Sequence, residues 1–296
     1  MTGTRPPALG IAYVPTLPPE RLRGLARAAE DSGLDELWVW EDCFKQSGIA
    51  SAAAALAWTV RITVGIGLLP VPLRNVALTA MELANLERMF PGRLVAGTGH
   101  GVQPWMEQTG ARVASPLTLL REHTAALRSL LEGERVTTTG RYVRLTDVVL
   151  DWPPAPPPPL MLGGAGPKAL ALAAELGDGV LLGACISESA VAEIAQRIAP
   201  LQTRPSRALV HSHLVATGAG AQERLEREVP RWGASYAPDI GIAGDAAAVA
   251  ASVDRLAAAG VSSVCFQPTE DEPDLEGLVH FLGSEVKPLV SSVGAG

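Results

Sequence analysis

The chain has 296 residues, of which 47% are hydrophobic and 19% charged, and its net charge is −7. A disordered chain would be poorer in apolar residues, and a nucleic-acid-binding protein would normally carry a basic surplus. The composition therefore favours a folded protein that does not bind nucleic acid.

Neither a membrane anchor nor a disulfide framework is expected. A membrane-spanning helix needs about 20 consecutive apolar residues, and the longest candidate, residues 50–60, is too short. The first seven residues lack the apolar core of a signal peptide. The three cysteines, Cys43, Cys185 and Cys265, form no CxxC pair. These features are typical of a reduced, cytoplasmic protein without a thiolate metal site.

Short β-branched runs alternate with alanine-rich amphipathic runs in the first half of the chain. Pro18 and Pro19 open the first helix, and Gly33 ends it. The alternation predicts strands at 9–14, 36–40, 62–69 and 94–97, and further helices at 49–58, 76–89 and 116–132.

The pattern is interrupted once and then resumes. Residues 135–149 are rich in Thr and Val around Gly140, which predicts a β-hairpin. The proline-rich tract 152–159 cannot be helical. It could link two domains, but we expect a rigid approach to the next strand because the alternation returns at once. Further strands are predicted at 160–163, 180–182, 208–216 and 263–267, and helices at 167–176, 187–199, 222–231, 245–259 and 274–290.

Eight strands, each followed by a helix, predict an α/β fold, the (β/α)8 TIM barrel. A doubly wound sheet shares this alternation, but the count of eight favours the barrel. We expect one domain over residues 1–296, with a hairpin and proline-rich insertion at about 134–159.

Two strand ends are rich in glycine, at residues 97–101 and 163–167. In a barrel, the chemistry lies at the carboxyl ends of the strands. The second glycine run precedes a helix that is expected to begin at Pro167, and backbone N–H groups at a helix N-terminus stabilise an anion. Lys168 adds a positive charge nearby. A turn that only needs the conformational freedom of glycine would give the same pattern.

Other chemistries find less support at these strand ends. The chain has no GxxxxGK[ST] or GxSxG motif and no convincing dinucleotide fingerprint. The ends of the fourth and seventh strands supply no carboxylate pair for a retaining glycosidase. His211 and His213 share one strand face, but without further ligands a buried polar pair is favoured over a metal site. This combination suggests that a bound cofactor performs the chemistry.

Four runs in chain order carry a family resemblance: residues 65–75, 84–93, 95–101, and 162–170 with Gly177-Asp178-Gly179. On these motifs the sequence resembles the bacterial luciferase-like monooxygenase superfamily, closest to the branch that uses the deazaflavin coenzyme F420. The resemblance implies a TIM barrel, a homodimer, and insertion segments that cap the C-terminal face of the barrel. The hairpin and the proline tract lie where such an insertion is expected.

The resemblance also implies a cofactor site in the barrel mouth. The phosphate-bearing tail of the cofactor is expected at 163–166 and at 99–102, and a non-prolyl cis peptide bond is expected at Gly67–Leu68. The cofactor-binding residues implied are Cys43, Gly67, Leu68, Thr98, Gly99, His100, Gly101, Val102, Gly163, Gly164, Ala165 and Gly166.

Two positions depart from the family pattern. Many F420-dependent members carry Asp-His after the second strand, where this chain has Asp42-Cys43. The sugar-phosphate dehydrogenase branch carries a catalytic Glu after the fourth strand, where this chain has His100. That difference argues against a sugar-phosphate reaction. His100 could supply a proton or only hydrogen-bond cofactor or backbone. Asp42 could contact the ring or substrate, or cap a helix.

The leading hypothesis is an F420-dependent oxidoreductase that transfers a hydride between the deazaflavin and a small organic substrate, with His100 and Asp42 as catalytic candidates. One alternative is an FMN-dependent monooxygenase that uses FMNH2 and oxygen. Another is a catalytically silent binding protein on a barrel scaffold.

Overall fold

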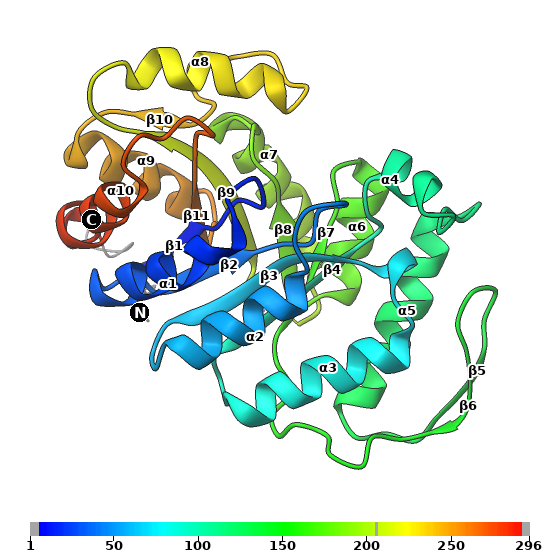
Figure 1. Ribbon diagram of the computed structural model, residues 1–296. Helices are drawn as coiled ribbons and strands as arrows, with labels where there is room; N and C mark the ends of the chain where they lie inside the picture. The colour runs from blue at the N-terminus through cyan, green and yellow to red at the C-terminus, as the bar shows by residue number, and fades with distance from the viewer. Residues whose placement is uncertain (1–5, 205–206, 292–296) are drawn as a thin grey trace, which may run out of the picture.

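The computed structural model describes residues 6–204 and 207–291, and eight parallel strands in this part of the chain close into a barrel (Figure 1). Around the barrel they follow the order β1, β2, β3, β4, β7, β8, β9, β11, and β11 pairs with β1. Their bounds are β1 Ala8–Ala12, β2 Glu36–Val39, β3 Thr63–Pro70, β4 Leu94–Gly99, β7 Leu160–Gly163, β8 Gly179–Leu182, β9 Leu209–Ala216 and β11 Ser263–Pro268. The predicted (β/α)8 barrel is confirmed.

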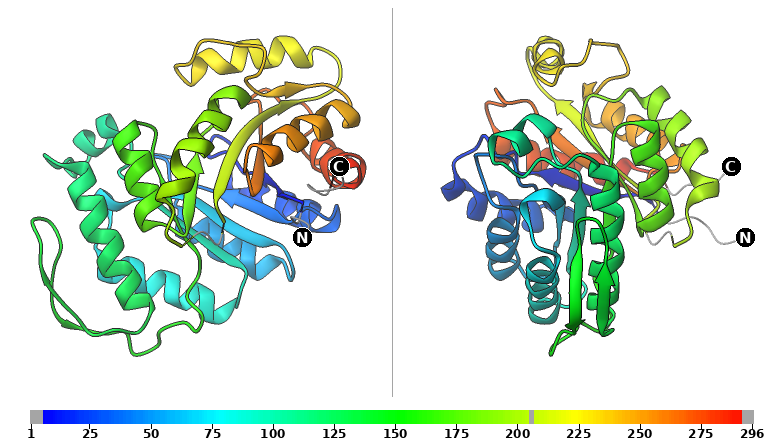
Figure 2. Two further views of the ribbon diagram at one scale, coloured as in Figure 1. Left: turned by 180° about the vertical axis from the view of Figure 1, so that it is seen from behind. Right: turned by 90° about the vertical axis from the view of Figure 1, so that its right-hand side faces the viewer.

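A ring of helices covers the outside of the barrel (Figure 2). They are α1 Leu22–Asp31, α2 Gly48–Trp58, α3 Val76–Met89, α5 Pro116–Leu131, α6 Pro167–Leu176, α7 Glu188–Ile198, α9 Ala246–Ala258 and α10 Leu275–Phe281. Helix α8 (Ala221–Arg231) belongs to the segment that follows β9 at the carboxyl ends of the strands. Helix α1 buries one stripe at helical spacing, from Leu22 to Ala29. Five helices begin at a residue whose side chain accepts a first-turn N–H: Ser47, Asn75, Ser187, Asp245 and Asp274.

The barrel interior is a packed core. An apolar layer of this core consists of Ala12, Val14, Trp38, Val95, Met161, Leu181, Val210 and Cys265. The indole of Trp38 lies so close to Gly65 that a Cβ there would overlap it. Below this layer, Glu36 accepts hydrogen bonds from the Trp38 indole at 2.7 Å and the Ser263 hydroxyl at 2.6 Å, and it pairs with Arg207. The amino-terminal end of the barrel is therefore closed by a satisfied polar cluster.

The hairpin is present, but it does not lie over the barrel mouth. Strands β5 (Val136–Thr139) and β6 (Arg144–Val148) project beside α5 (Figure 1). Glu122 of α5 accepts the backbone N–H groups of residues 141–143 at 2.8–3.0 Å, and the Tyr142 hydroxyl accepts the N–H of Ser115. These bonds hold the hairpin along the outside of α5. The segments that rise from the carboxyl ends are instead 100–115 and 217–241.

The proline tract is a rigid approach to β7, as predicted. Arg88 of α3 stacks on the Trp152 ring at 5.2 Å and donates to the Pro153 carbonyl at 3.2 Å. At its other end the Pro159 carbonyl accepts the N–H of Ala96 in β4. Both ends are thus tied to the barrel.

Three elements differ from the prediction. The short helix α4 (Gln103–Gln108) and the two-residue strand β10 (Ile242–Ala243) were not predicted. The last predicted helix divides into α10, a π-helical turn over Leu282–Val286 and a 3-10 turn over Lys287–Leu289. Across the described residues, no helix combines the length and apolar character needed to cross a bilayer.

Candidate active site at the carboxyl ends of the strands

The floor of the barrel mouth is built around Leu68, at the end of β3. The peptide bond Gly67–Leu68 is cis, as the resemblance implied. The Leu68 side chain packs over the ends of β4 and β7, where a Cβ on Gly99 would lie 2.6 Å from its Cδ2 and a Cβ on Gly163 would be closer still. These two glycines therefore make room for a leucine. Thr98, which lies between Gly97 and Gly99 in β4, is fully buried.

The turn after β7 presents the N-terminus of α6 to the mouth. Gly164 packs against Ala169, since a Cβ on Gly164 would lie 2.7 Å from the Ala169 Cβ. Gly166 is the N-cap of α6, and no side chain of the described residues caps this helix. A Cβ on Gly166 would meet nothing within 4 Å. Ala165 and Lys168 are exposed. Uncapped first-turn N–H groups beside open space and a lysine form a setting that favours an anion.

The loop after β4 fixes the orientation of His100. Its Nδ1 lies 2.8 Å from the carbonyl oxygen of Gly101, so Nδ1 must carry the proton. The Gln103 amide donates to the carbonyls of both His100 and Gly101, and Gly101 adopts a φ of 70° that suits glycine. The Nε2 of His100 makes no hydrogen bond to any described residue and is the atom available to a ligand. Val102 is exposed beside it.

Asp42 does not cap the following helix, because Ser47 does so. Burial raises the pKa of the Asp42 carboxyl, and this effect is opposed by the charge of Lys45 and by a hydrogen bond with Trp40. The neighbouring Glu41 accepts from Arg74 at 3.2 Å and from the Gly48 N–H at 3.1 Å. This bracing by Arg74 was not predicted, although it holds the loop that carries Asp42.

The cysteines near the mouth are protonated thiols at neutral pH. The pKa of Cys43 is raised by burial and by the charges of Glu41 and Asp42. Burial and the charge of Glu228 raise the pKa of Cys185 to about 11. Neither setting produces the thiolate that a nucleophile requires.

Two further polar residues of the mouth were missed. Ser212 of β9 alternates with the interior residue Val210 and is half-buried. Its hydroxyl donates to the Gln267 Oε1 of β11 at 3.2 Å. Gln267 is 2% exposed, and its Nε2 has no hydrogen-bond partner among the described residues. The sequence signal that could have identified both residues is a polar side chain at an interior position of an otherwise apolar strand.

His211 and His213 do not face the mouth. Both are buried between the barrel and the helices, and His213 Nε2 lies 3.1 Å from the Ser252 hydroxyl of α9. Within residues 6–204 and 207–291, no three His, Cys, Asp or Glu side chains are grouped to hold a metal ion.

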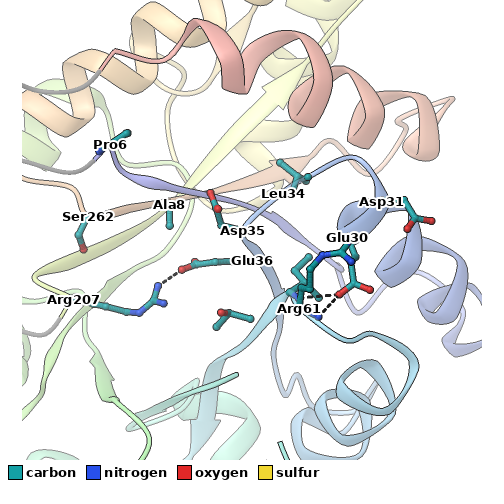
Figure 3. A pocket seen from close by; sticks show the side chains of 13 residues that line it. Pro6, Ala8, Glu30, Asp31, Leu34, Asp35, Glu36, Arg61, Arg207 and Ser262 are labelled. Carbon is teal, nitrogen blue, oxygen red and sulfur yellow. Dashed lines mark hydrogen bonds and ion pairs between the residues drawn. The ribbon is translucent and has the colours of Figure 1, made fainter. Parts of the chain in front are cut away.

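A cavity of about 730 Å³ lies at the opposite, amino-terminal end of the barrel (Figure 3). Three of its carboxylates already have partners: Glu36 pairs with Arg207, Asp35 pairs with Lys287, and Glu30 accepts the backbone N–H groups of residues 60–62. In barrel enzymes this end contributes to stability, whereas catalysis occurs at the carboxyl ends. We therefore place the candidate site at the mouth and not in this cavity.

The fold and the mouth together describe a TIM-barrel protein that has an anion-favouring helix N-terminus and an oriented histidine at the carboxyl ends of its strands. The sequence model of the luciferase-like monooxygenase family matches residues 3–260. The chain belongs to this family.

Individual relatives agree with that assignment. A 5,10-methylenetetrahydromethanopterin reductase of Methanolobus tindarius is 34% identical over 176 residues, 59% of this chain and 53% of that protein. An F420-dependent glucose-6-phosphate dehydrogenase of Nakamurella multipartita is 31% identical over 181 residues, 55% of this chain and 52% of that protein. The structure of the coenzyme F420-dependent tetrahydromethanopterin reductase of Methanopyrus kandleri superposes with a TM-score of 0.81 at 21% identity, over 97% of this chain and 100% of that one. The aligned part spans about half the length of the two curated relatives.

Proposed function

We propose that the protein is an F420-dependent oxidoreductase that transfers a hydride between the deazaflavin and a small organic substrate. The observation that carries this proposal is the uncapped N-terminus of α6, with open space at Gly166 and the exposed Lys168, at the mouth of the barrel. The two relatives above, one of them named F420-dependent, support the choice of deazaflavin.

The residues of the mouth fit such a cofactor. The α6 turn would hold the phosphate of the cofactor tail, since its free N–H groups and Lys168 provide donors and charge. Leu68, Gly99 and Gly163 would form an apolar wall for a flat ring. When bound, the deazaflavin supplies a hydride donor or acceptor.

His100 and Asp42 would handle the proton. Because Nδ1 of His100 is bonded to the Gly101 carbonyl, only Nε2 can exchange a proton with a substrate. It donates as the imidazolium and accepts as the neutral ring. Asp42 is half-buried, and the raised pKa of its carboxyl makes protonation easier than for an exposed aspartate. The proposal thus gives each group a role that its contacts permit.

We propose a homodimer for the assembly. Helix α3 exposes three large apolar side chains, with Leu78 47%, Met81 54% and Met89 61% exposed. Such a face suits a second copy of the chain. Sedimentation should give a dimer, and Met81→Asp should give monomers. We also propose a cytoplasmic location, which the unpaired thiols of the described cysteines support.

The proposed reaction is tested by anaerobic incubation with reduced F420 and a panel of carbonyl and alkene compounds. Reoxidation of the coenzyme that depends on both enzyme and organic acceptor is expected. Turnover only with FMNH2 and oxygen would replace the proposal by a monooxygenase. Binding of F420 without any turnover would favour the silent binding protein.

A further inference from the structure

A buried arginine joins the ends of two neighbouring strands to helix α3. Arg74 follows β3, and its side chain is 12% exposed. Its Nη1 donates to the two carboxylate oxygens of Glu41 at 3.2 and 3.3 Å, and its Nη2 pairs with Glu82 of α3. One guanidinium therefore ties the end of β2 to both the β3 loop and α3.

Glu41 is connected to two parts of the proposed site. It immediately precedes Asp42, one of the two candidates for proton transfer. Its backbone N–H donates to the carbonyl of Leu68, on the floor of the mouth, at 3.3 Å. Its carboxylate also accepts the N–H of Gly48, the first residue of α2, at 3.1 Å. The position of Glu41 therefore sets the positions of Asp42 and Leu68 relative to each other.

No other cation can take the place of Arg74. Among the described residues, Arg74 is the only basic side chain that pairs with Glu41 or Glu82. On the α5 side, His123 is 1% exposed, and burial together with the charge of Arg74 lowers its pKa to about 4. The ring of His123 is therefore neutral at neutral pH, and both carboxylates depend on one guanidinium.

A buried pair of this kind selects one geometry more than it adds net stability. The cost of removing both charges from water largely offsets their attraction. The planar fork of a guanidinium fixes the directions of the carboxylates that it binds, which the point charge of a lysine does not. Placement matters for turnover, since a shift of about 1 Å at a reacting group can cost about 100-fold in rate.

We propose, resting on the proposed function, that Arg74 is a positioning residue for hydride transfer. Acting through Glu41, it holds Asp42 and Leu68 in the arrangement that turnover requires. Within the described residues, the hydrogen bonds and ion pairs of its side chain go to Glu41 and Glu82, so none reaches the α6 turn that is assigned to the coenzyme tail. Loss of the fork should therefore lower kcat and leave the Kd of F420 nearly unchanged.

Hydrogen exchange tests the positioning in the chain without coenzyme. The Glu41 amide is bonded to Leu68, and the Gly48 amide is bonded to the carboxylate that Arg74 holds. Arg74→Lys keeps the charge without the planar fork, and we expect these two amides to exchange about fivefold faster or more. Glu41→Gln gives the same readout should the lysine variant fail to fold.

Arg128→Lys is the matched control. Arg128 of α5 is also largely buried, with a side chain 19% exposed, and it pairs with Asp178 at 3.0 Å. Asp178 directly precedes β8, at the amino-terminal end of the barrel and away from the mouth. The control is expected to leave the exchange of the Glu41 and Gly48 amides at the parent rate.

Kinetics test the consequence for turnover. With reduced F420 and the acceptor on which the parent chain is most active, Arg74→Lys should lower kcat about tenfold, with the Kd of F420 changed less than about threefold. Arg128→Lys should leave both unchanged. Because Arg74 acts through Glu41, adding Arg74→Lys to Glu41→Gln should lower kcat by no more than about a further twofold.

Three results would overturn the proposal. They are exchange of the two amides at the parent rate in Arg74→Lys, an unchanged kcat in that variant, and fully additive effects in the double variant. The proposed function fails separately, when the parent chain binds no F420 in a fluorescence titration. Faster exchange in Arg74→Lys would then still establish that Arg74 places Asp42 and Leu68, because that experiment uses neither coenzyme nor acceptor.

Discussion

Replacing Gly166 by aspartate places a negative charge at the N-terminus of α6 without steric cost. Gly166 has a φ of −84° and a ψ of 161°, which any residue adopts, and a Cβ there meets nothing within 4 Å. Aspartate is a favoured N-cap, so stability should rise by a few tenths of a kcal/mol relative to glycine. The fold is therefore expected to remain intact.

The same change should weaken the binding of the cofactor phosphate. A carboxylate about 5 Å from a phosphate charge costs about 3 kcal/mol at an effective dielectric constant of 20, and the lost helix-end interaction adds about 1 kcal/mol. Screening and relaxation reduce this sum, so we expect a Kd for F420 about 10 to 100 times higher, or about 1.4 to 2.7 kcal/mol.

Fluorescence titration of F420 measures this effect, with two control variants. Gly166→Asn has the same size without the charge and should weaken binding less. Gly166→Ala should bind like the parent chain, because it leaves the N–H groups uncovered. An aspartate variant that binds F420 as tightly as the alanine variant would show that the phosphate does not lie at α6.

Further changes probe the core, the proton path and the buried histidines. Gly65→Ala should lower the free energy of unfolding by about 1–3 kcal/mol in urea, because the new methyl group overlaps an indole, whereas Gly24→Ala in open space should raise it by about 0.5–1 kcal/mol. His100→Gln should lower kcat about 10²-fold or more with little change in the Kd of F420; an unchanged kcat would remove its proton role. Burial lowers the pKa of His123 and of His213 to about 4. As the pH is lowered, these histidines bind protons in the unfolded chain before they do so in the folded chain. The free energy of unfolding should therefore fall by about 3 kcal/mol for each histidine as the pH is lowered from 6.5 to 4. His213→Asn should flatten this slope, and an identical slope would contradict the buried neutral ring.

The barrel could be predicted because its signals are local. The β-branched runs and the amphipathic stripes, such as Leu22 to Ala29, fix strands and helices through burial on one side. Helix α4 has six residues and too few turns to show a periodicity. The position of the hairpin depends on Glu122 accepting three backbone N–H groups from residues about 20 positions away, which no local pattern encodes.

Part of the candidate site could be inferred from local sequence signals, and the rest could not. The glycine turn before α6 and His100 each come directly after a predicted strand, so the local motif pointed to each of them. The role of Gly99 and Gly163 as space for Leu68 depends on packing between three strands. The Ser212–Gln267 pair joins residues 55 positions apart. Such contacts are decided by the closure of the barrel, and a single sequence carries no direct signal of them.

The measurement that tests the central claim most directly is a parallel titration of the purified chain with F420 and with FMN. The account predicts saturable quenching of F420 fluorescence at one site per chain, weakened by Gly166→Asp and not displaced by an equal concentration of FMN. Absence of quenching, or complete displacement of F420 by FMN, would contradict it.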